Sequence, residues 1–440
     1  MIPSIQNKSR DQLAAEFDAV FGGLISTPAK KPTTYRRIGT GGGGVWIIIP
    51  GEVKITQVLA NLRRPLGERY LLILSNLYVR GLYRKKTTKK LGNYLPMHRD
   101  ILRTLGGENY FKLIEYGQSV RHLIKSPQNY IEGVQANKYM LNRKGFSLKT
   151  QQRYELTTKA AIRIRSSDAD DRKAEFVSKG SVYQKIADSV DGLEFDYDKA
   201  LKYVSSLPNG DQKIHRKNII EQLMFDGAIW SHDGQGRNYT VMVNVPRDIR
   251  RYFTHSAGPL YLVDVSSCHA LLHLHLYPSQ GSEEKKYRNI VENGRFWTFM
   301  NDAAGKPFNL SVPDEKEQLK TTVMADIFYS HAEPKGGVKK LFAVTFKREF
   351  PILWEQVDDR KRGQRKDKPS APISKAMMTT ESEVVHEAMN LLQNKPYPLI
   401  TIHDSIVTTK NGVADVRQAL QQAFAQLNLN PTLREELLTA

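Results

Sequence analysis

Apolar and polar positions follow different periods in the two halves of this 440-residue chain. Residues 1–200 carry mostly helix-like spacing, whereas the chain after about residue 210 mixes helical spacing with short β-rich runs. The segment 205–210, Ser-Ser-Leu-Pro-Asn-Gly, has the composition of a linker. The pattern therefore predicts a mainly helical N-terminal region, 1–205, and a mixed α/β region, 206–440.

Two apolar runs in the second region each lead into an aspartate. The first run carries Asp264 and continues into an apolar, helix-like stretch. The second places His403, Asp404 and Ser405 at a turn between two β-rich runs. Taken alone, Asp264 equally fits the cap of the helix that follows it. Together the two runs predict an antiparallel sheet in which the strand of Asp264 lies beside the Asp404 hairpin.

A helix is predicted to begin at Pro313 and Asp314, because proline and an acid are common in a first helical turn. Four residues that follow are spaced four apart and share one stripe of that helix. The two lysines of this stripe could bind a triphosphate, and the apolar residues at its C-terminal end could cover a base. The same spacing also fits apolar residues that face the core. These residues are Lys316, Lys320, Met324 and Phe328.

A glycine-rich turn at residues 233–239 reads Asp-Gly-Gln-Gly-Arg-Asn-Tyr. Arg237 at this turn suits phosphate binding, because the guanidinium fork matches phosphate oxygens. An ordinary hairpin explains the same residues.

The helix-like stretch after Asp264 holds one cysteine and three histidines, Cys268, His269, His273 and His275. This grouping raises the question of zinc, but no second pair of ligands stands at metal spacing. We therefore expect histidines on a helix face.

The chain is strongly basic, with 65 Lys and Arg against 46 Asp and Glu and a formal net charge of +19. This balance favours a polyanionic partner, above all nucleic acid. Residues 80–90 and 360–368 each hold six basic side chains, which fit either a non-specific phosphate grip or a solvated loop. Residues 41–44 are four glycines without a following Gly-Lys-Ser/Thr, so we expect a turn there and not a phosphate loop.

Cys268 is the single cysteine, which excludes an internal disulfide and fits a reducing compartment. The N-terminus lacks a secretory pattern, and no apolar run approaches the length of a membrane span. We therefore expect a cytoplasmic protein with no membrane partner.

In their order along the chain, these motifs resemble those of the superfamily that joins family A DNA polymerases with single-subunit, phage-type RNA polymerases. The resemblance covers roughly residues 230–410. Family-A-like features are also present at residues 249–253 and around Phe350, Pro351 and Trp354. The matching positions are Asp233/Gly236/Arg237/Tyr239, Asp264/Ser266/His273, Lys320/Met324/Phe328 and His403/Asp404/Ser405.

The resemblance implies a right-hand α+β polymerase fold. Residues 206–440 would form palm and fingers, with the fingers at about 285–375, and residues 1–205 would form a basic, thumb-like region that binds nucleic acid. Asp264 and Asp404 would hold two Mg²⁺ ions, with the Val265 carbonyl as a further ligand. Lys320 would neutralise charge on the phosphates and protonate the leaving group, and Lys316 would support it.

The resemblance also implies a nucleotide- and strand-binding set. Phe328 and Tyr329 would lie by the sugar and base of the incoming nucleotide, Arg237 would contact the template or primer backbone, and His403 would orient Asp404 and the primer end. Met324 and His273 complete the set. The implied partners are a DNA template, the nascent strand and nucleoside triphosphates.

Departures from the family patterns bear on the choice of sugar. Ser405 stands where family A DNA polymerases carry Glu, and His269 stands where they carry a sugar-gating Glu, so both favour RNA synthesis. Phe328 stands where the RNA enzymes carry Tyr, which removes a hydroxyl associated with ribose selection.

The chain is only about half the usual length of a single-subunit RNA polymerase. These features favour a compact DNA-directed RNA polymerase of phage or other mobile-element type, acting in the host cytoplasm and leaving room for an accessory protein in promoter or primer recognition.

Three alternatives stay open from the sequence. The chain could be a family-A-like DNA-directed DNA polymerase. It could be another Mg²⁺ enzyme on nucleic acid, such as a nuclease, which would need a third or fourth clustered acid. It could also be a non-catalytic nucleic-acid-binding protein with a degenerate palm.

Overall fold

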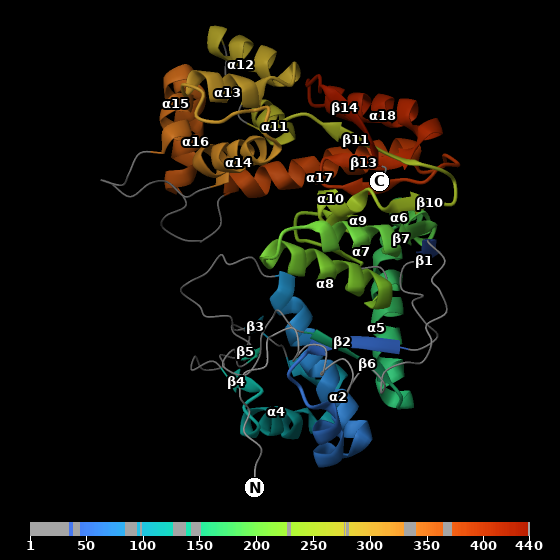
Figure 1. Ribbon diagram of the computed structural model, residues 1–440. Helices are drawn as coiled ribbons and strands as arrows, with labels where there is room; N and C mark the ends of the chain where they lie inside the picture. The colour runs from blue at the N-terminus through green and yellow to red at the C-terminus, as the bar shows by residue number, and fades with distance from the viewer. Residues whose placement is uncertain are drawn as a thin grey trace.

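Helices make up most of the fold, and small antiparallel sheets lie among them (Figure 1). The computed structural model describes residues 35–37, 45–83, 95–96, 99–125, 138–141, 151–226, 230–276, 278, 281–329, 340–363 and 372–438. Residues 41–44 and the greater part of both basic runs lie outside these ranges. Across the described ranges, no helix combines the length and the apolar character needed to cross a membrane.

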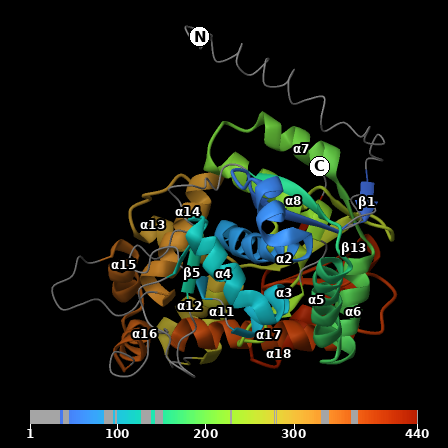
Figure 2. The ribbon, with the colours of Figure 1, turned by 90° about the horizontal axis from the view of Figure 1, so that it is seen from below.

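The N-terminal unit has a hydrophobic core of its own, drawn from residues between Ile47 and Ala161. Its centre is helix α2 (Ile55–Tyr83), whose apolar stretch around Tyr70 is buried against strand β2. In Figure 1 this unit lies at the bottom, and in Figure 2, seen from below, α2 lies in front of the rest. The other elements are β2 (Val45–Pro50) paired with β6 (Gln151–Leu156), α3 (Arg99–Gly106), η2 (Gly107–Asn109), α4 (Tyr110–Ser119), and the sheet of β3 (Leu95–Pro96), β5 (Lys138–Leu141) and β4 (Leu123–Lys125).

The two cores meet along helix α5 (Lys159–Val177) and not at the predicted linker 205–210. Ala161 belongs to the N-terminal core, whereas Phe176 and the following buried residues belong to the larger core. The sequence boundary was misplaced because residues 181–204 present their apolar faces to the second core. These residues form α6 (Ser181–Asp191), β7 (Leu193–Asp196) and α7 (Tyr197–Ser206), with α8 (Asp211–Asp226) after them.

The strand β7 confirms this assignment, because it lies at the centre of a small antiparallel sheet. It pairs with β1 (Tyr35–Arg37) on one side and with β10 (Phe253–His255) on the other. The first 205 residues therefore contain several strands beside the expected helices, and part of them belongs to the C-terminal unit.

A four-stranded sheet has the order β12-β13-β11-β14. As expected, the strand that carries Asp264 is antiparallel to the second strand of the Asp404 hairpin, and Asp264 lies opposite Ser405. The outer strand β14 supplies Arg434 as the other neighbour of Asp264. The strands are β12 (Ile400–Ile402), β13 (Ser405–Thr409), β11 (Leu260–Val265) and β14 (Leu433–Leu438).

Helices surround this sheet, and a largely helical layer lies beside it at the upper left of Figure 1. The long helix α17 (Pro372–Leu392) packs against α11 (Cys268–Leu276) and α18 (Val413–Ala425). Short elements lead into the sheet: β8 (Ser231–His232), β9 (Asn238–Tyr239), α9 (Val241–Asn244) and α10 (Arg247–Arg250), with η4 (Lys410–Gly412) after β13. The helical layer consists of α12 (Ser282–Glu292), α13 (Phe296–Ala303), α14 (Pro313–Met324), the π-helical turn η3 (Ala325–Tyr329), α15 (Leu341–Glu349) and α16 (Pro351–Gly363).

Candidate active site

The two strand-associated aspartates are brought together at one end of the four-stranded sheet. The pairing of Asp264 with Ser405 places Asp404 at the next position of the hairpin. The Ser405 hydroxyl donates a hydrogen bond to Asp264 Oδ1 at 2.7 Å. His403, the other residue of the tight turn, has a φ of 53°, a left-handed conformation that is uncommon for a residue with a side chain.

Negative charge accumulates at Asp404. Burial raises the pKa of its carboxyl well above the usual range, and the nearby carboxylates of Glu381 and Asp264 raise it further. The buried thiol of Cys268 has a raised pKa because of burial first and then the same three acids. Three carboxylates therefore share one region, and at Asp404 their repulsion favours binding of a proton or a cation.

The turn at residues 233–239 is stabilised by hydrogen bonds to the side chain of Asp233. Asp233 Oδ1 accepts hydrogen bonds from the backbone of Gln235 and Arg237, and its Oδ2 accepts one from the Tyr239 hydroxyl at 2.9 Å. Gly236 has a φ of 84°, and a side-chain carbon there would lie 3.1 Å from the Ser382 hydroxyl on α17. The hydrogen bonds to Asp233 and the left-handed conformation of Gly236 thus determine the position of the Arg237 backbone.

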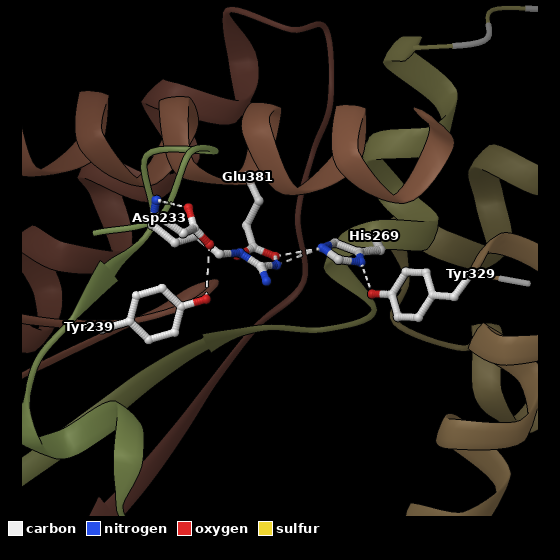
Figure 3. A network of polar contacts seen from close by, with 6 residues as sticks. Asp233, Tyr239, His269, Tyr329 and Glu381 are labelled. Atoms are coloured by element: carbon white, nitrogen blue, oxygen red, sulfur yellow. Dashed lines mark hydrogen bonds and ion pairs between the residues drawn. The ribbon is translucent and has the colours of Figure 1, made fainter. Parts of the chain in front are cut away.

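A polar network near Asp404 includes Arg237, and Figure 3 shows its members Glu381, His269 and Tyr329 in a row. Arg237 Nη2 lies 2.7 Å from Glu381 Oε2, and His269 Nε2 lies 2.6 Å from the same oxygen. The Tyr329 hydroxyl contacts His269 Nδ1. The four side chains come from the hairpin turn, α11, η3 and α17, so the network links elements far apart in the sequence.

This network changes the place expected for Arg237. The Arg237 side chain is 12% exposed, and its guanidinium forms an ion pair with the buried Glu381, so it is not presented to a template or primer backbone. Burial lowers the pKa of His403, and the positive charge of Arg237 lowers it further, which leaves this imidazole neutral.

The helix predicted from Pro313 is present as α14, and Lys316 and Lys320 are both partly exposed on it. Lys320 lies 3.5 Å from Glu317 one turn away. The pKa of Arg247 is raised mainly by its hydrogen bond to Glu436, and the charges of Asp264 and Glu317 contribute. Arg247 is therefore within electrostatic range of both Asp264 on β11 and Glu317 on α14.

The end of this helix differs from the expectation. The backbone changes to a π-helical turn at Ala325–Tyr329, which interrupts the four-residue stripe. Phe328 is fully buried, Met324 is partly buried against the same core, and Tyr329 is 38% exposed. The prediction that Phe328 contacts the nucleotide is thus wrong for this structure, and the residue that turns toward the site is Tyr329.

His273 was also expected to bind the nucleotide and is instead part of the core. It is fully buried against the rings of Phe328 and Tyr287, and burial lowers its pKa to about 3. It does not converge with His269, which faces Glu381, or with the exposed His275. Within the described ranges, no group of three or more His, Cys, Asp or Glu is arranged to hold a metal.

Sequence reasoning missed Glu381 as the third acid. The residue occupies an apolar stripe of α17, between Met377 and Val384 or Val385, all of which are buried. An acid at a core position of an amphipathic helix is unusual and is a usable sequence signal. Arg247 and Arg434 carried no comparable signal, because only the folded sheet brings them near Asp264.

Comparison with known proteins adds little to this geometry. No family model and no curated protein sequence matches the chain. Among solved structures, the chain is similar to the POL domain of Pol1 from M. smegmatis in complex with DNA primer-template and dNTP, with a TM-score of 0.38 and 12% identity. The match covers 90% of this chain and 66% of that one, just under two thirds. A likeness of this size leaves function to the site itself.

Proposed function

We propose that this chain is a template-directed nucleic-acid polymerase, a nucleotidyltransferase with a two-metal mechanism, and most simply a compact DNA-directed RNA polymerase. The observation that carries the proposal is that Asp264, on β11, lies near Asp404, in the turn that leads into the neighbouring antiparallel strand β13. In this proposal the sheet is the palm and the helices α12–α16 are the fingers.

The carboxylates fit Mg²⁺, which in phosphoryl-transfer sites uses one or two protein carboxylates and completes its shell with water and substrate phosphates. The raised pKa of Asp404, caused by burial and then by the carboxylates of Glu381 and Asp264, supports this assignment because a bound cation would relieve their repulsion. Asp264 and Asp404 would hold the ions, with the Val265 carbonyl as a further ligand. Bound Mg²⁺ would supply activation of the 3′-hydroxyl and stabilisation of the leaving pyrophosphate.

The chain's own residues would orient the reactants. Ser405 holds one oxygen of Asp264, so this carboxylate keeps one orientation. Lys320 and Lys316 on α14 would neutralise the triphosphate, and Lys320 would give a proton to the leaving group. Met324 and Tyr329, farther along the same element, would lie by the sugar and base.

The nucleic acid would approach from the basic side of the sheet. Arg247 lies near Asp264, and its side chain is 67% exposed although it pairs with Glu436. Arg434 is exposed on the neighbouring strand. These two arginines replace Arg237 as the proposed contacts with a strand backbone, and the net charge of +19 supports a polyanion. His403 would orient Asp404 and the primer end.

The test is nucleotide incorporation on single-stranded DNA, with and without a primer, in the presence of Mg²⁺. Ribo- and deoxyribonucleotides are compared for the wild type, Asp404→Ala and a matched control, Asp302→Ala, which changes an exposed aspartate on α13. We expect ribonucleotide incorporation by the wild type and by Asp302→Ala and a loss of at least about a thousandfold in Asp404→Ala.

The outcomes separate the candidate functions. Incorporation of deoxyribonucleotides alone would identify a DNA polymerase. Binding of DNA without any synthesis, in the wild type as in Asp404→Ala, would contradict the polymerase proposal and favour the binding protein. Degradation of the template that depends on Asp404 would indicate a nuclease.

A further inference from the structure

A small cavity lies next to His403, in the turn that carries Asp404. Its volume is about 10 Å³, which is close to the space that a single water molecule needs. One wall is helix α17, and the rest of the lining comes from Arg237 and strand β9, from β12 and from the turn. The cavity therefore lies where three parts of the chain that are distant in sequence meet.

Four residues that line the cavity each carry a polar side-chain atom that is buried and has no hydrogen-bond partner among the described residues. Buried polar atoms without a partner are rare in folded proteins, because each one loses its hydration and gains nothing in return. Four of them around one cavity of this size indicate a common partner. The atoms are Arg237 Nε, Asn238 Oδ1, Thr401 Oγ1 and His403 Nδ1.

The chemistry of these atoms decides what the partner is. Arg237 Nε only donates a hydrogen bond, and the amide oxygen of Asn238 only accepts one. Thr401 and His403 can each take either role, the imidazole according to its tautomer. The partner must therefore accept from Arg237 and donate to Asn238. Water does both, whereas ammonium has no acceptor and a halide ion has no donor.

We propose that this cavity is a specific binding site for one structural water molecule, which links Arg237, β9 and β12 to the turn of Asp404. The site is inferred from the cavity and its four polar atoms, so it does not depend on the function proposed above.

The water has a consequence for Asp404, and this part of the inference rests on the polymerase function. His403 has a φ of 53°, a conformation that a residue with a side chain keeps only where its surroundings hold it. A hydrogen bond from the water to the imidazole is such a contact, one residue before Asp404. Thr401 is then a positioning residue, because it acts on Asp404 through the water and His403.

A high-resolution crystal structure of the full-length chain tests the site directly. We expect one ordered water within about 2.7–3.2 Å of all four atoms. A second crystal, grown in sodium bromide, distinguishes water from a halide by the anomalous signal of bromide. Bromide in the cavity, or four side chains that bond to one another with no density between them, would overturn the proposal.

Thr401→Val and Thr408→Val form a matched pair for the positioning role. Each removes one buried hydroxyl without a described partner from the same sheet, but Thr401 lines the cavity and Thr408 does not. In Thr401→Val we expect the kcat of nucleotide incorporation to fall by about tenfold, with KM for the nucleotide changed by about twofold or less. Thr401→Ser keeps the hydroxyl and should restore kcat, and Thr408→Val should retain it. Circular dichroism checks that each variant is folded.

The remaining outcomes separate the site from its consequence. An equal fall of kcat in Thr401→Val and Thr408→Val, or no recovery in Thr401→Ser, would contradict the positioning role of Thr401. The electron density is measured without substrate. A wild type that holds the water but incorporates no nucleotide would therefore support the water site and contradict the proposed function.

Discussion

At the scale of single residues, Asp264 on β11 and Asp404 in the turn before β13 lie near each other but differ in their surroundings. Asp264 is held by the Ser405 hydroxyl, whereas burial and then the carboxylates of Glu381 and Asp264 raise the pKa of Asp404. A bound cation would relieve this repulsion. The hydroxyl of Ser405 would then matter by fixing the orientation of a metal ligand.

Removal of this hydroxyl tests its role. In Ser405→Ala we expect the Mg²⁺ concentration for half-maximal synthesis to rise by about tenfold or more, because hydrogen bonds that orient metal ligands carry that much affinity. A titration of synthesis rate against Mg²⁺ measures the change. Thr408→Val on the same strand serves as control, since the buried Thr408 hydroxyl has no hydrogen-bond partner among the described residues. An equal shift in both variants would contradict a specific role for Ser405.

At the scale of elements, the π-helical turn decides which aromatic residue faces the site. A regular α-helix would continue the stripe from Lys320 to Phe328, but the wider turn buries Phe328 and exposes Tyr329. Phe328 therefore contributes to the stability of the helical layer, whereas the adjacent Tyr329 faces the site.

This division predicts that substitutions at the two neighbouring residues lower the free energy of unfolding by very different amounts. Phe328→Ala should lower the free energy of unfolding by about 3–5 kcal/mol, because it leaves a cavity among packed rings. Tyr329→Phe should lower it by only about 0.5–1.5 kcal/mol, because it removes one hydrogen bond to His269 and leaves no cavity. Urea unfolding of both variants measures the difference. If Tyr329→Phe lowered the free energy of unfolding more than Phe328→Ala does, Tyr329 would be the buried residue and the π-helical turn would be absent.

A second element-scale feature is the start of α5. The buried Glu68 of α2 accepts hydrogen bonds from Tyr154 and from the backbone and hydroxyl groups of Thr157 and Thr158, the last of which caps α5. Burial alone would raise the pKa of Glu68, but these hydrogen bonds outweigh it and lower the pKa from 4.5 to about 2. The ionised carboxylate therefore ties α5 to the N-terminal core.

The lowered pKa gives a defined dependence of stability on pH. Because the folded value lies below the unfolded one, this contribution is complete above pH 4.5 and is lost as the pH falls from 4.5 toward 2. At pH 7, Glu68→Gln should lower the free energy of unfolding by about 1–3 kcal/mol. The difference from wild type should shrink below pH 4.5, whereas Glu155→Gln, an exposed change on β6, should show no such trend. Urea unfolding between pH 3 and 7 measures these differences. A difference between wild type and Glu68→Gln that stays constant over this range would refute this account.

At the scale of the whole molecule, two cores are joined along α5, and the chain carries a net charge of +19. If basic side chains across both units contact a nucleic acid, each phosphate contact releases bound counterions. Affinity should then depend steeply on salt, whatever the sequence of the strand.

The corresponding measurement is fluorescence anisotropy of a labelled single-stranded DNA at several salt concentrations. We expect the logarithm of the affinity to fall linearly with the logarithm of salt, by about 0.7 per phosphate contacted. Arg247→Ala should reduce this slope by about one contact, whereas Arg103→Ala, on the N-terminal helix α3 and paired with Glu108, should leave it nearly unchanged. Binding that is insensitive to salt would argue against a nucleic-acid partner.

The sequence by itself determined the local features of the site. Apolar runs that end in Asp264 and Asp404 predicted their strands, and Pro313 predicted the start of the helix with Lys316 and Lys320, because strand and helix patterns depend on neighbouring residues. The antiparallel pairing of the two strands followed from the same patterns and is present in the sheet.

Only the tertiary structure decided which distant groups meet. Glu381 reaches His269 across 112 positions of sequence, and no local pattern specifies such a contact. Of the two aromatic residues expected beside the nucleotide, Phe328 is buried and only Tyr329 is exposed, at the end of the wider π-helical turn. The boundary along α5 could not be predicted for the same reason as the contact between Glu381 and His269, because packing against a core depends on residues far apart in the sequence. The polar segment 205–210 does not indicate which core its neighbouring elements join.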